Sequence, residues 1–446
     1  MTISPYFRII YFIMLNPLAQ ELNERLKDTV AGELLSDEGL RMYFPKGIIA
    51  QSEEAKQGAS KANGTIGMTI IEGKPAILPS IQKSVPSFDA RSLVAYAPTA
   101  GQKEFRTVWQ KQIIDKNPLL KTKKISLPVV VPGLTAGISY IADLFIDETK
   151  PLLAPDPSWD NYALITEARR GAELHRFNFF DNGKIDTASL ENAIKKEAAA
   201  CSSVRLLLNF PQNPSGYSPT KREVIEICRI IGEAASGGTK LLIICDDAYF
   251  GLNYEDDIEE QSLFAHIADI HKNVLAVKID GPTKEDFVWG FRCGFVTFAS
   301  KNYTDEHYDA LIKKLMGIIR SSVSCSATPS QSILMRSYTD PDNEAQKAAF
   351  RNILQARYRA VRNFVDSHTS SAIEAMPFNS GYFMSFRLNG IDAETLRKKL
   401  LSEKGIGTIS IDSRTLRVAF SSIDEDKIES VYADIYAAAD GMYRAL

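Results

Sequence analysis

The sequence predicts an α/β fold: a large domain with a mainly parallel sheet covered by helices, and a small α+β domain. Short, continuous apolar runs alternate with amphipathic segments through the middle of the chain. This order is typical of parallel sheets buried on both faces. The composition, 446 residues with 45% hydrophobic and 24% charged, suits a large globular core. After about Pro329, a long polar amphipathic helix followed by mixed short elements predicts the small domain.

Individual elements follow from hydrophobic periodicity. Apolar runs predict large-domain strands at 127–131, 152–154, 204–209, 241–245, 274–279 and 294–298. Helical periodicity predicts helices at 18–26 after Pro17, then at 138–146, 188–199 and 220–236. The segment 58–64 is expected to be an exposed loop. In the small domain we expect helices at 343–364, 393–403 and 425–438, and strands at 382–388 and 415–420.

Charge, cysteines and histidines exclude several classes of function. A net charge of −3 gives no basic excess for nucleic acid. The five cysteines are an odd number without a Cys-x-x-Cys pair, which indicates reduced thiols of a cytoplasmic protein. The five histidines lack metal-binding spacing, so no metal is expected. The apolar stretch 6–15 is too short to span a membrane, so we expect a packed arm or a true start at Met14 rather than an export signal.

Four short motifs in a fixed order carry the functional signal. An Asn-Pro-Ser-Gly segment begins at Asn213, an Asp-Asp-Ala-Tyr segment runs from Asp246 to Tyr249, and Lys284 precedes Arg292 by eight residues. The first three motifs each follow a predicted strand, where α/β sheets bind ligands. These groups are the ones needed to hold pyridoxal phosphate. Lysine can bond with its aldehyde, a carboxylate can keep its ring nitrogen protonated, and arginine can hold its phosphate.

Each motif also has a purely structural interpretation. Asn-Pro-Ser-Gly is a common turn. Asp246 and its neighbour Asp247 could be solvated or cap a helix, and we expect Asp247 to matter little. Lys284 taken alone would be a surface lysine, and Arg292 an ion-pair partner. The order of the motifs, rather than any one of them, favours the cofactor.

With these motifs the chain resembles fold-type I pyridoxal-phosphate enzymes of the class I/II aminotransferase group, most of all the aspartate aminotransferase branch. The resemblance covers roughly residues 65–420. It implies a seven-stranded-type sheet and a small domain formed from both termini. The expected division is 1–78 for an N-terminal arm and part of the small domain, 79–330 for the large cofactor-binding domain, and 331–446 for the rest of the small domain. It also implies a homodimer with shared active sites.

The resemblance assigns five residues to the cofactor ring. Lys284 would be the catalytic lysine that bonds with the cofactor, and Asp246 would pair with the ring nitrogen. Tyr249 and Asn213 would bind the ring hydroxyl. Trp159 would stack on the ring, although a tryptophan is more often a core residue.

The same resemblance assigns residues to the cofactor phosphate. Arg292 would bind it together with the Gly133-Leu134-Thr135 loop, which opens a helix, and Tyr96 would reach it from the neighbouring subunit. The sequence departs from the family at two places. Gly281 stands where a serine or threonine is usual, and the phosphate loop lacks the usual Ser-Gly-Thr order.

Three further residues are implied to bind substrate. Arg417, in an apolar strand, would grip the α-carboxylate, because an isolated buried charge needs an anionic partner. Gly67 would lie in a glycine loop over the substrate. Arg320 stands where relatives specific for dicarboxylates carry an arginine for the distal carboxylate. Its alternative is a helix C-terminal arginine that binds groups of its own chain.

The sequence therefore predicts a pyridoxal-phosphate-dependent enzyme that transfers an amino group between an L-amino acid and a 2-oxo acid, with a dicarboxylic pair such as aspartate/glutamate as the more specific hypothesis. A lyase or decarboxylase on the same fold is the first alternative, because fold and cofactor are shared. A non-catalytic regulator is a more distant alternative, because the N-terminal segment is too short and not basic enough for a DNA-binding module. No membrane or nucleic-acid partner is expected.

Overall fold

The computed structural model describes residues 15–17, 20–21, 24, 48–65, 67–72, 74–83, 88, 90–201 and 203–446. The apolar stretch 6–15 lies outside these residues except for its last position. The helix predicted at 18–26 is described only at residues 20, 21 and 24, each of which is helical.

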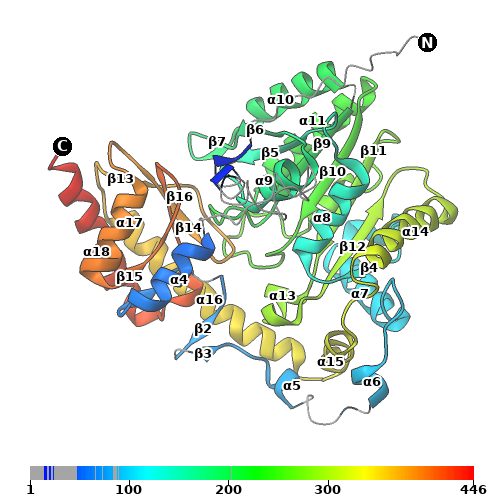
Figure 1. Ribbon diagram of the computed structural model, residues 1–446, viewed down its shortest axis with the longest axis horizontal. Coiled ribbons are helices and arrows are strands. Elements are labelled where there is room, and N and C mark those ends of the chain that lie inside the picture. The colour runs from blue at the N-terminus through cyan, green and yellow to red at the C-terminus, as the bar shows by residue number, and fades with distance from the viewer. Residues whose placement is uncertain are drawn as a thin grey trace.

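A seven-stranded sheet forms the centre of the large domain (Figure 1). Six strands run in one direction and β12 runs against them. The predicted mainly parallel α/β fold is thus confirmed. In spatial order the strands are β4 (Val129–Val131), β12 (Gly294–Ala299), β11 (Val274–Asp280), β10 (Lys240–Asp246), β9 (Ser203–Asn209), β5 (Leu152–Asp156) and β6 (Leu174–Asn178).

Helices cover both faces of this sheet because its connections run in two directions. α10 (Thr187–Cys201), α11 (Lys221–Ser236) and α12 (Leu263–Ile267) each join a strand to one nearer β4, whereas α8 (Leu134–Phe145) leads from β4 back to β5. Right-handed crossovers place such connections on opposite faces. α8 accordingly packs on β4, β11 and β12, and α14 (Asp305–Ser322) packs outside it.

The small domain is built on a four-stranded antiparallel sheet. Its strands are β13 (Ile373–Ala375), β14 (Met384–Leu388), β17 (Thr415–Val418) and β16 (Ile409–Asp412), and its helices are α16 (Asn343–Ser367), α17 (Ala393–Lys404) and α18 (Glu425–Tyr443). Helix α4 (Ile48–Gly58) packs against α17 and β16. The domain boundaries at residues 78 and 330 stay predictions.

The expected exposed loop at 58–64 is partly wrong. Strand β1 (Ala62–Asn63) pairs in parallel with β15 (Ile406–Gly407), and Gly64 is buried. β1 and β15 lie more than 340 positions apart in the chain, so a local sequence pattern could not indicate their pairing.

Shorter elements complete the structure. They are β2 (Ile70–Ile71), β3 (Lys74–Pro75), α5 (Pro79–Gln82), α6 (Ala90–Val94), α7 (Lys103–Lys116), η2 (Pro118–Thr122), α9 (Asn161–Ala163), η3 (Leu164–Ala168), β7 (Phe180–Asp181), β8 (Lys184–Ile185), α13 (Pro282–Glu285), η4 (Trp289–Phe291), α15 (Thr328–Tyr338) and η5 (Phe420–Ser422). Within the described ranges, no helix has the length and apolar character needed to cross a membrane. Nor do three acidic, histidine or cysteine side chains there gather in a way that could hold a metal ion. The cytoplasmic location stays a prediction.

The two domains meet at Gly216, the last residue of the Asn-Pro-Ser-Gly segment. Its carbonyl accepts hydrogen bonds from the backbone N–H groups of Asn379 and Ser380, both at 2.9 Å. Its φ is +79°, and a Cβ there would lie 1.9 Å from the Phe383 carbonyl oxygen. Only glycine permits both this backbone conformation and this approach.

We therefore expect Gly216→Ala to lower the free energy of unfolding by about 3 kcal/mol or more, because strain and a backbone clash combine. Gly251→Ala is the matched control, since Gly251 has φ +81° but open space around it. The control should cost only about 1 kcal/mol. Urea denaturation of the two variants measures the difference, and equal losses would contradict the clash.

Candidate active site

A cavity of about 170 Å³ opens at the carboxyl ends of β9 and β10. It is the place at which α/β sheets commonly bind ligands. Its lining combines apolar, aromatic and charged side chains: Leu134, Thr135, Ile138, Trp159, Tyr162, Asn209, Asn213, Asp246, Ala248, Tyr249, Lys284 and Arg292. The cavity thus brings together eight of the residues that the sequence singled out.

Asp246 is the last residue of β10 and is buried. One carboxylate oxygen accepts a hydrogen bond from the Tyr162 hydroxyl at 2.6 Å, and the other accepts from the Ala248 N–H at 3.2 Å. Burial raises the pKa of Asp246 to about 6, although Tyr162 and the nearby Lys284 favour its charged form. A cation bound in the cavity would favour the carboxylate further.

Lys284 lies in the short helix α13, which Pro282 opens. Its ammonium nitrogen lies 4.8 Å from the centre of the Tyr249 ring and makes no hydrogen bond to any described residue. Burial, assisted by Arg292, lowers the pKa of Lys284 to about 8, against the attraction of Asp246. The lowered pKa increases the fraction of this amine that is neutral, and so nucleophilic, near neutral pH.

Arg292 and the start of α8 form the opposite end of the cavity. Arg292 has a left-handed backbone, with φ +47°, and its Nη1 donates to the Trp289 carbonyl at 2.9 Å. Gly133 precedes α8 with φ +93°, and a Cβ on it would lie 2.3 Å from Arg292 Nη2. Glycine therefore lets the guanidinium approach the helix N-terminus, where N–H groups and the helix dipole favour an anion.

The Gly281 departure has a steric cause. A Cβ at Gly281 would lie 2.9 Å from Gly294 Cα and 3.0 Å from the Cys293 carbonyl oxygen, so serine or threonine would clash with backbone. The adjacent Thr283 hydroxyl donates to the Cys293 carbonyl at 3.4 Å. The loop between β11 and α13 thus packs tightly against β12 at the position where the resemblance led us to expect a serine or threonine.

Arg417, from β17 of the small domain, is 2% exposed. Its Nη1 donates to the Asn213 side-chain oxygen at 2.8 Å, and its Nη2 donates to the Thr65 carbonyl at 3.4 Å. Its Nε is buried without a hydrogen-bond partner among the described residues, and Arg417 forms no ion pair with a carboxylate there. Burial lowers the pKa of Arg417 to about 10. A buried guanidinium without a direct carboxylate partner is a strong site for a carboxylate.

Aromatic rings form the walls of the cavity. Trp159 is half-buried and meets Tyr162 edge-on, with ring centres 5.4 Å apart. Tyr249 packs against Tyr382 and Phe383 at 5.4 and 5.5 Å, and burial raises the pKa of its hydroxyl above the ordinary value. The phenol therefore stays protonated and able to donate a hydrogen bond.

Five predicted site residues are not part of the cavity lining: Gly133 and Arg417, which lie next to lining residues as described above, and Gly67, Tyr96 and Arg320. Gly67 lies beside the cavity, since a Cβ there would be 3.9 Å from the hydroxyl of Tyr249, which lines it. Tyr96 is 92% exposed. Arg320 is exposed in the last turn of α14, and its guanidinium donates to the Ser324 hydroxyl. That contact matches the helix-terminal alternative for Arg320 within its own chain.

Sequence reasoning did not assign Tyr162 and Asn209 to the site. Tyr162 holds the Asp246 carboxylate, and Asn209 Nδ2 donates to the Asp246 carbonyl at 2.7 Å while its oxygen accepts from the Asn213 N–H at 2.8 Å. Asn209 ends a predicted strand, so its position carried a signal. Tyr162 offered only its place three residues after Trp159.

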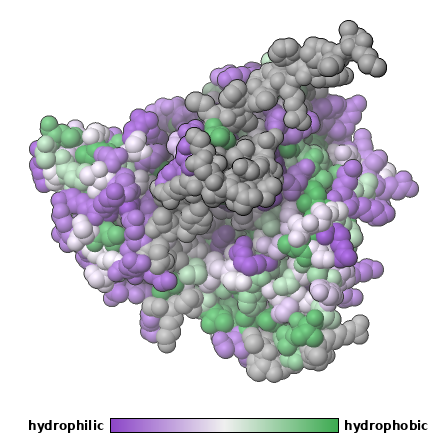
Figure 2. All heavy atoms as spheres, viewed as in Figure 1, coloured by the Kyte–Doolittle hydropathy of each residue, from purple (hydrophilic) through white to green (hydrophobic). Residues whose placement is uncertain are grey.

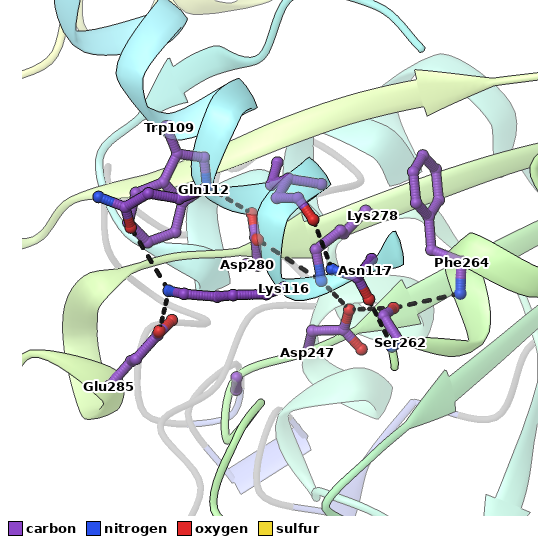
Figure 3. Close-up of polar contacts among 12 residues, drawn as sticks. Trp109, Gln112, Lys116, Asn117, Asp247, Ser262, Phe264, Lys278, Asp280 and Glu285 are labelled. Carbon is purple, nitrogen blue, oxygen red and sulfur yellow. Dashed lines mark hydrogen bonds and ion pairs between the residues drawn. The ribbon is translucent and has the colours of Figure 1, made fainter. Parts of the chain in front are cut away.

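Asp247 contradicts the expectation that it matters little. It is 4% exposed and ion-paired with the buried Lys278, and it accepts from the Ser262 hydroxyl at 2.5 Å (Figure 3). Removing it would leave Lys278 with only a more distant partner, and breaking such a buried pair destabilises by about 3–5 kcal/mol. Lys278 lies within the predicted strand 274–279, but the local sequence gave no indication that it pairs with Asp247.

The residues present fit pyridoxal phosphate. The cavity joins an amine of lowered pKa, a buried carboxylate, ring-stacking aromatic groups and an anion site at a helix N-terminus. Gly133 leaves space that a Cβ would fill, and Arg417 leaves a buried donor unpaired. Lys284, Asp246, Trp159, Tyr249 and Arg292 would hold the group.

Comparisons with known proteins give one consistent result. A family model described as aminotransferase class I and II matches residues 70–435. An aspartate aminotransferase of Bacillus sp. (strain YM-2) is 24% identical over 332 residues, which cover 73% of this chain and 78% of the relative. The mitochondrial aspartate aminotransferase of Saccharomyces cerevisiae is 25% identical over 251 residues, 51% of this chain and 54% of that protein.

Solved structures share the fold. An aminotransferase from Anaerococcus prevotii superposes with a TM-score of 0.81 at 22% identity, over 91% of this chain and 99% of its own. A kynurenine aminotransferase from Pyrococcus horikoshii, in complex with PMP, gives a TM-score of 0.76 at 16% identity, over 93% and 98%. At these identities the likeness shows the fold alone.

Proposed function

Since the chain belongs to the class I and II aminotransferase family and is a pyridoxal-phosphate-dependent aminotransferase, we propose that its reaction takes place at Lys284, between an L-amino acid and a 2-oxo acid. The observation that carries this proposal is the Lys284 amine of lowered pKa inside a cavity that also holds Asp246 and Arg292. The family implies the cofactor, and the donor set of the cavity suits it.

Each side chain then has a chemical task. Pyridoxal phosphate, when bound, supplies an electron sink for the electrons of the substrate Cα–H bond. The Asp246 carboxylate, held in place by the Tyr162 hydroxyl, would stabilise a protonated ring nitrogen. Lys284 moves the Cα proton as general base and acid, and a pKa near 8 suits that task at neutral pH. Arg292 and the N-terminus of α8 hold the phosphate.

Arg417 is proposed to fix the substrate. Its Nη1 bond to Asn213 and its contact with the Phe383 ring, 4.2 Å from the guanidinium carbon to the ring centre, hold the guanidinium in one orientation. The α-carboxylate of an amino acid would supply the missing anion. Binding through a bidentate pair would also orient the Cα–H bond.

A dicarboxylic substrate pair is the more specific proposal. Two relatives are named aspartate aminotransferase. In the described part of the chain, Arg292 is the only arginine that lines the cavity, and it is assigned to the phosphate. A distal carboxylate would therefore need a cation from elsewhere. Arg320 is exposed, and we propose that it serves the site of a second subunit.

A homodimer would bring Tyr96 to the partner's phosphate. Tyr96 and Val94 are 92% and 79% exposed, which is unusual for large apolar and aromatic side chains. Figure 2 shows apolar side chains gathered over the neighbouring α5, α6 and α15. An exposed apolar surface of this kind favours a protein interface.

We expect borohydride treatment of cofactor-loaded protein to attach the cofactor to Lys284, because its neutral amine lies in the cavity. Peptide mass mapping identifies the labelled lysine, and an amino-acid panel followed by cofactor absorbance tests the half-reaction. The product should be a 2-oxo acid formed without CO₂. A label on another lysine would contradict the site, and release of CO₂ would favour the decarboxylase alternative.

Arg417→Leu should lower kcat/KM for every amino acid, because a desolvated charge pair is lost. The decrease should correspond to a loss of about 2–5 kcal/mol of transition-state stabilisation. Arg320→Leu should lower it selectively for aspartate and glutamate. Arg414→Leu, at an exposed position next to β17, is the matched control and should have little effect. Equal effects of Arg320→Leu on acidic and neutral substrates would leave that arginine with a structural role only.

The shared-site proposal is tested by mixing subunits. Inactive Tyr96→Phe and Lys284→Ala chains, refolded together, should recover activity, because one site of each mixed dimer receives both intact residues. Activity assays on the mixture measure the recovery. A fully active monomer in analytical sedimentation would refute the shared site.

A further inference from the structure

A buried charge cluster lies on the face of the central sheet opposite the cavity. It consists of Lys278 on β11, Asp247 directly after β10, and Asp280 at the end of β11, which are 1%, 4% and 5% exposed. Lys278 is ion-paired with Asp247 and lies 3.5 Å from Asp280 (Figure 3). Central strands of parallel sheets are normally apolar, so these charges are unexpected there.

The strand register explains which face the cluster occupies. Lys278 lies opposite Cys245 on β10, and Asp246 lies opposite Ile279. Because successive side chains of a strand point to opposite faces, Asp247, Lys278 and Asp280 share one face while Asp246 points to the other. Ile279 packs near Gly137 of α8, on the cavity side. The cluster therefore lies directly behind the cavity.

Each carboxylate of the cluster holds a segment that carries a cavity residue. Asp247 follows Asp246 in the chain, its N–H donates to the Ile279 carbonyl at 2.9 Å, and its carboxylate also accepts from Ser262. Asp280 precedes Lys284 by four residues and accepts from the Trp109 indole N–H at 3.1 Å. Lys278 joins both carboxylates and so joins the two segments.

We propose that Lys278 is a positioning residue that fixes Asp246 and Lys284 relative to each other by binding Asp247 and Asp280 from behind the sheet. Stability alone does not account for the cluster. Replacing a buried ion pair by apolar groups is often neutral or stabilising. Although burial alone would lower the pKa of Lys278, Asp247 and Asp280 hold it above the ordinary value, so the lysine stays charged. The proposal rests on the roles proposed for Asp246 and Lys284.

The experiment compares Lys278→Met, and the double variant Lys278→Met/Asp247→Asn, with the wild-type enzyme. The double variant leaves no unpaired charge at Asp247 and keeps the protein testable if the single variant fails to fold. We expect kcat to fall about tenfold to hundredfold, because proton transfer depends on ångström-scale placement. KM for the amino acid should change little, because Arg417 is untouched.

A second readout uses the protein without cofactor. Lysines carrying ¹³C-methyl groups are titrated by NMR, and the Lys284 signal is identified by its loss in Lys284→Met. Its titration midpoint should shift in the variants, because Asp246 and Lys284 change their separation. Arg397→Met is the control: it removes a buried cation of the small domain that pairs with Glu54 and Glu394. It should lower Tm without changing kcat or the Lys284 titration.

Wild-type kcat and an unchanged Lys284 titration in the folded double variant would overturn the positioning role. The same would follow if Arg397→Met lowered kcat equally for an equal loss in Tm. If the wild-type protein itself bound no cofactor at Lys284, the proposed function would fail instead. The two failures are therefore distinguishable.

Discussion

The parallel register of β9, β10 and β11 is the constraint on which the site depends. Backbone hydrogen bonds align Asn209 with Asp246, and Asp246 with Ile279, so the three strands end at one level. The residues that follow must then lie within one small buried volume. Asn213 and Lys284 reach the cavity because their strands end there, not because they are near Asp246 in sequence.

Placing ionisable side chains together in a buried volume shifts their pKa values, and these shifts determine the chemistry of the site. Burial favours the neutral forms of Asp246 and Lys284, and their pKa values move towards each other, to about 6 and about 8. Arg417 adds a second buried cation without a carboxylate partner among the described residues. The cavity as a whole therefore favours bound anions, which a phosphate and an amino-acid carboxylate would supply.

The small domain and the buried Lys278 cluster both contribute to this arrangement. The small domain supplies Arg417 and the Phe383 ring, and the close approach at Gly216 brings them to the large domain. Behind the sheet, the Lys278 cluster joins the segments after β10 and β11. The cavity is thus bounded by domain packing on one side and by a charge network on the other. Movement of either would change the distances between the reacting groups.

The sequence by itself determined the elements whose signals are local. Continuous apolar runs identified the central strands, and the polar residues after them identified Asn213, Asp246 and Lys284, because strand period and strand ends are encoded by neighbouring residues. The edge strand β6 was not predicted, because its exposed positions interrupt the apolar run. The positive-φ and close-approach positions at Gly133 and Gly216 were visible only as glycines.

Tertiary structure alone decided which side chains are partners. Tyr162 meets Asp246 across 84 positions, Lys278 meets Asp247 across 31, and Arg417 meets Asn213 across 204. Strand register and domain packing set these contacts, and neither leaves a local pattern in the chain. That is why Asp247 reads as a bystander in the sequence and is a buried ion-pair partner in the fold. The sequence specifies the chemical group of each residue. The folded chain decides whether that group is buried and which partner it meets, and these two factors set its pKa.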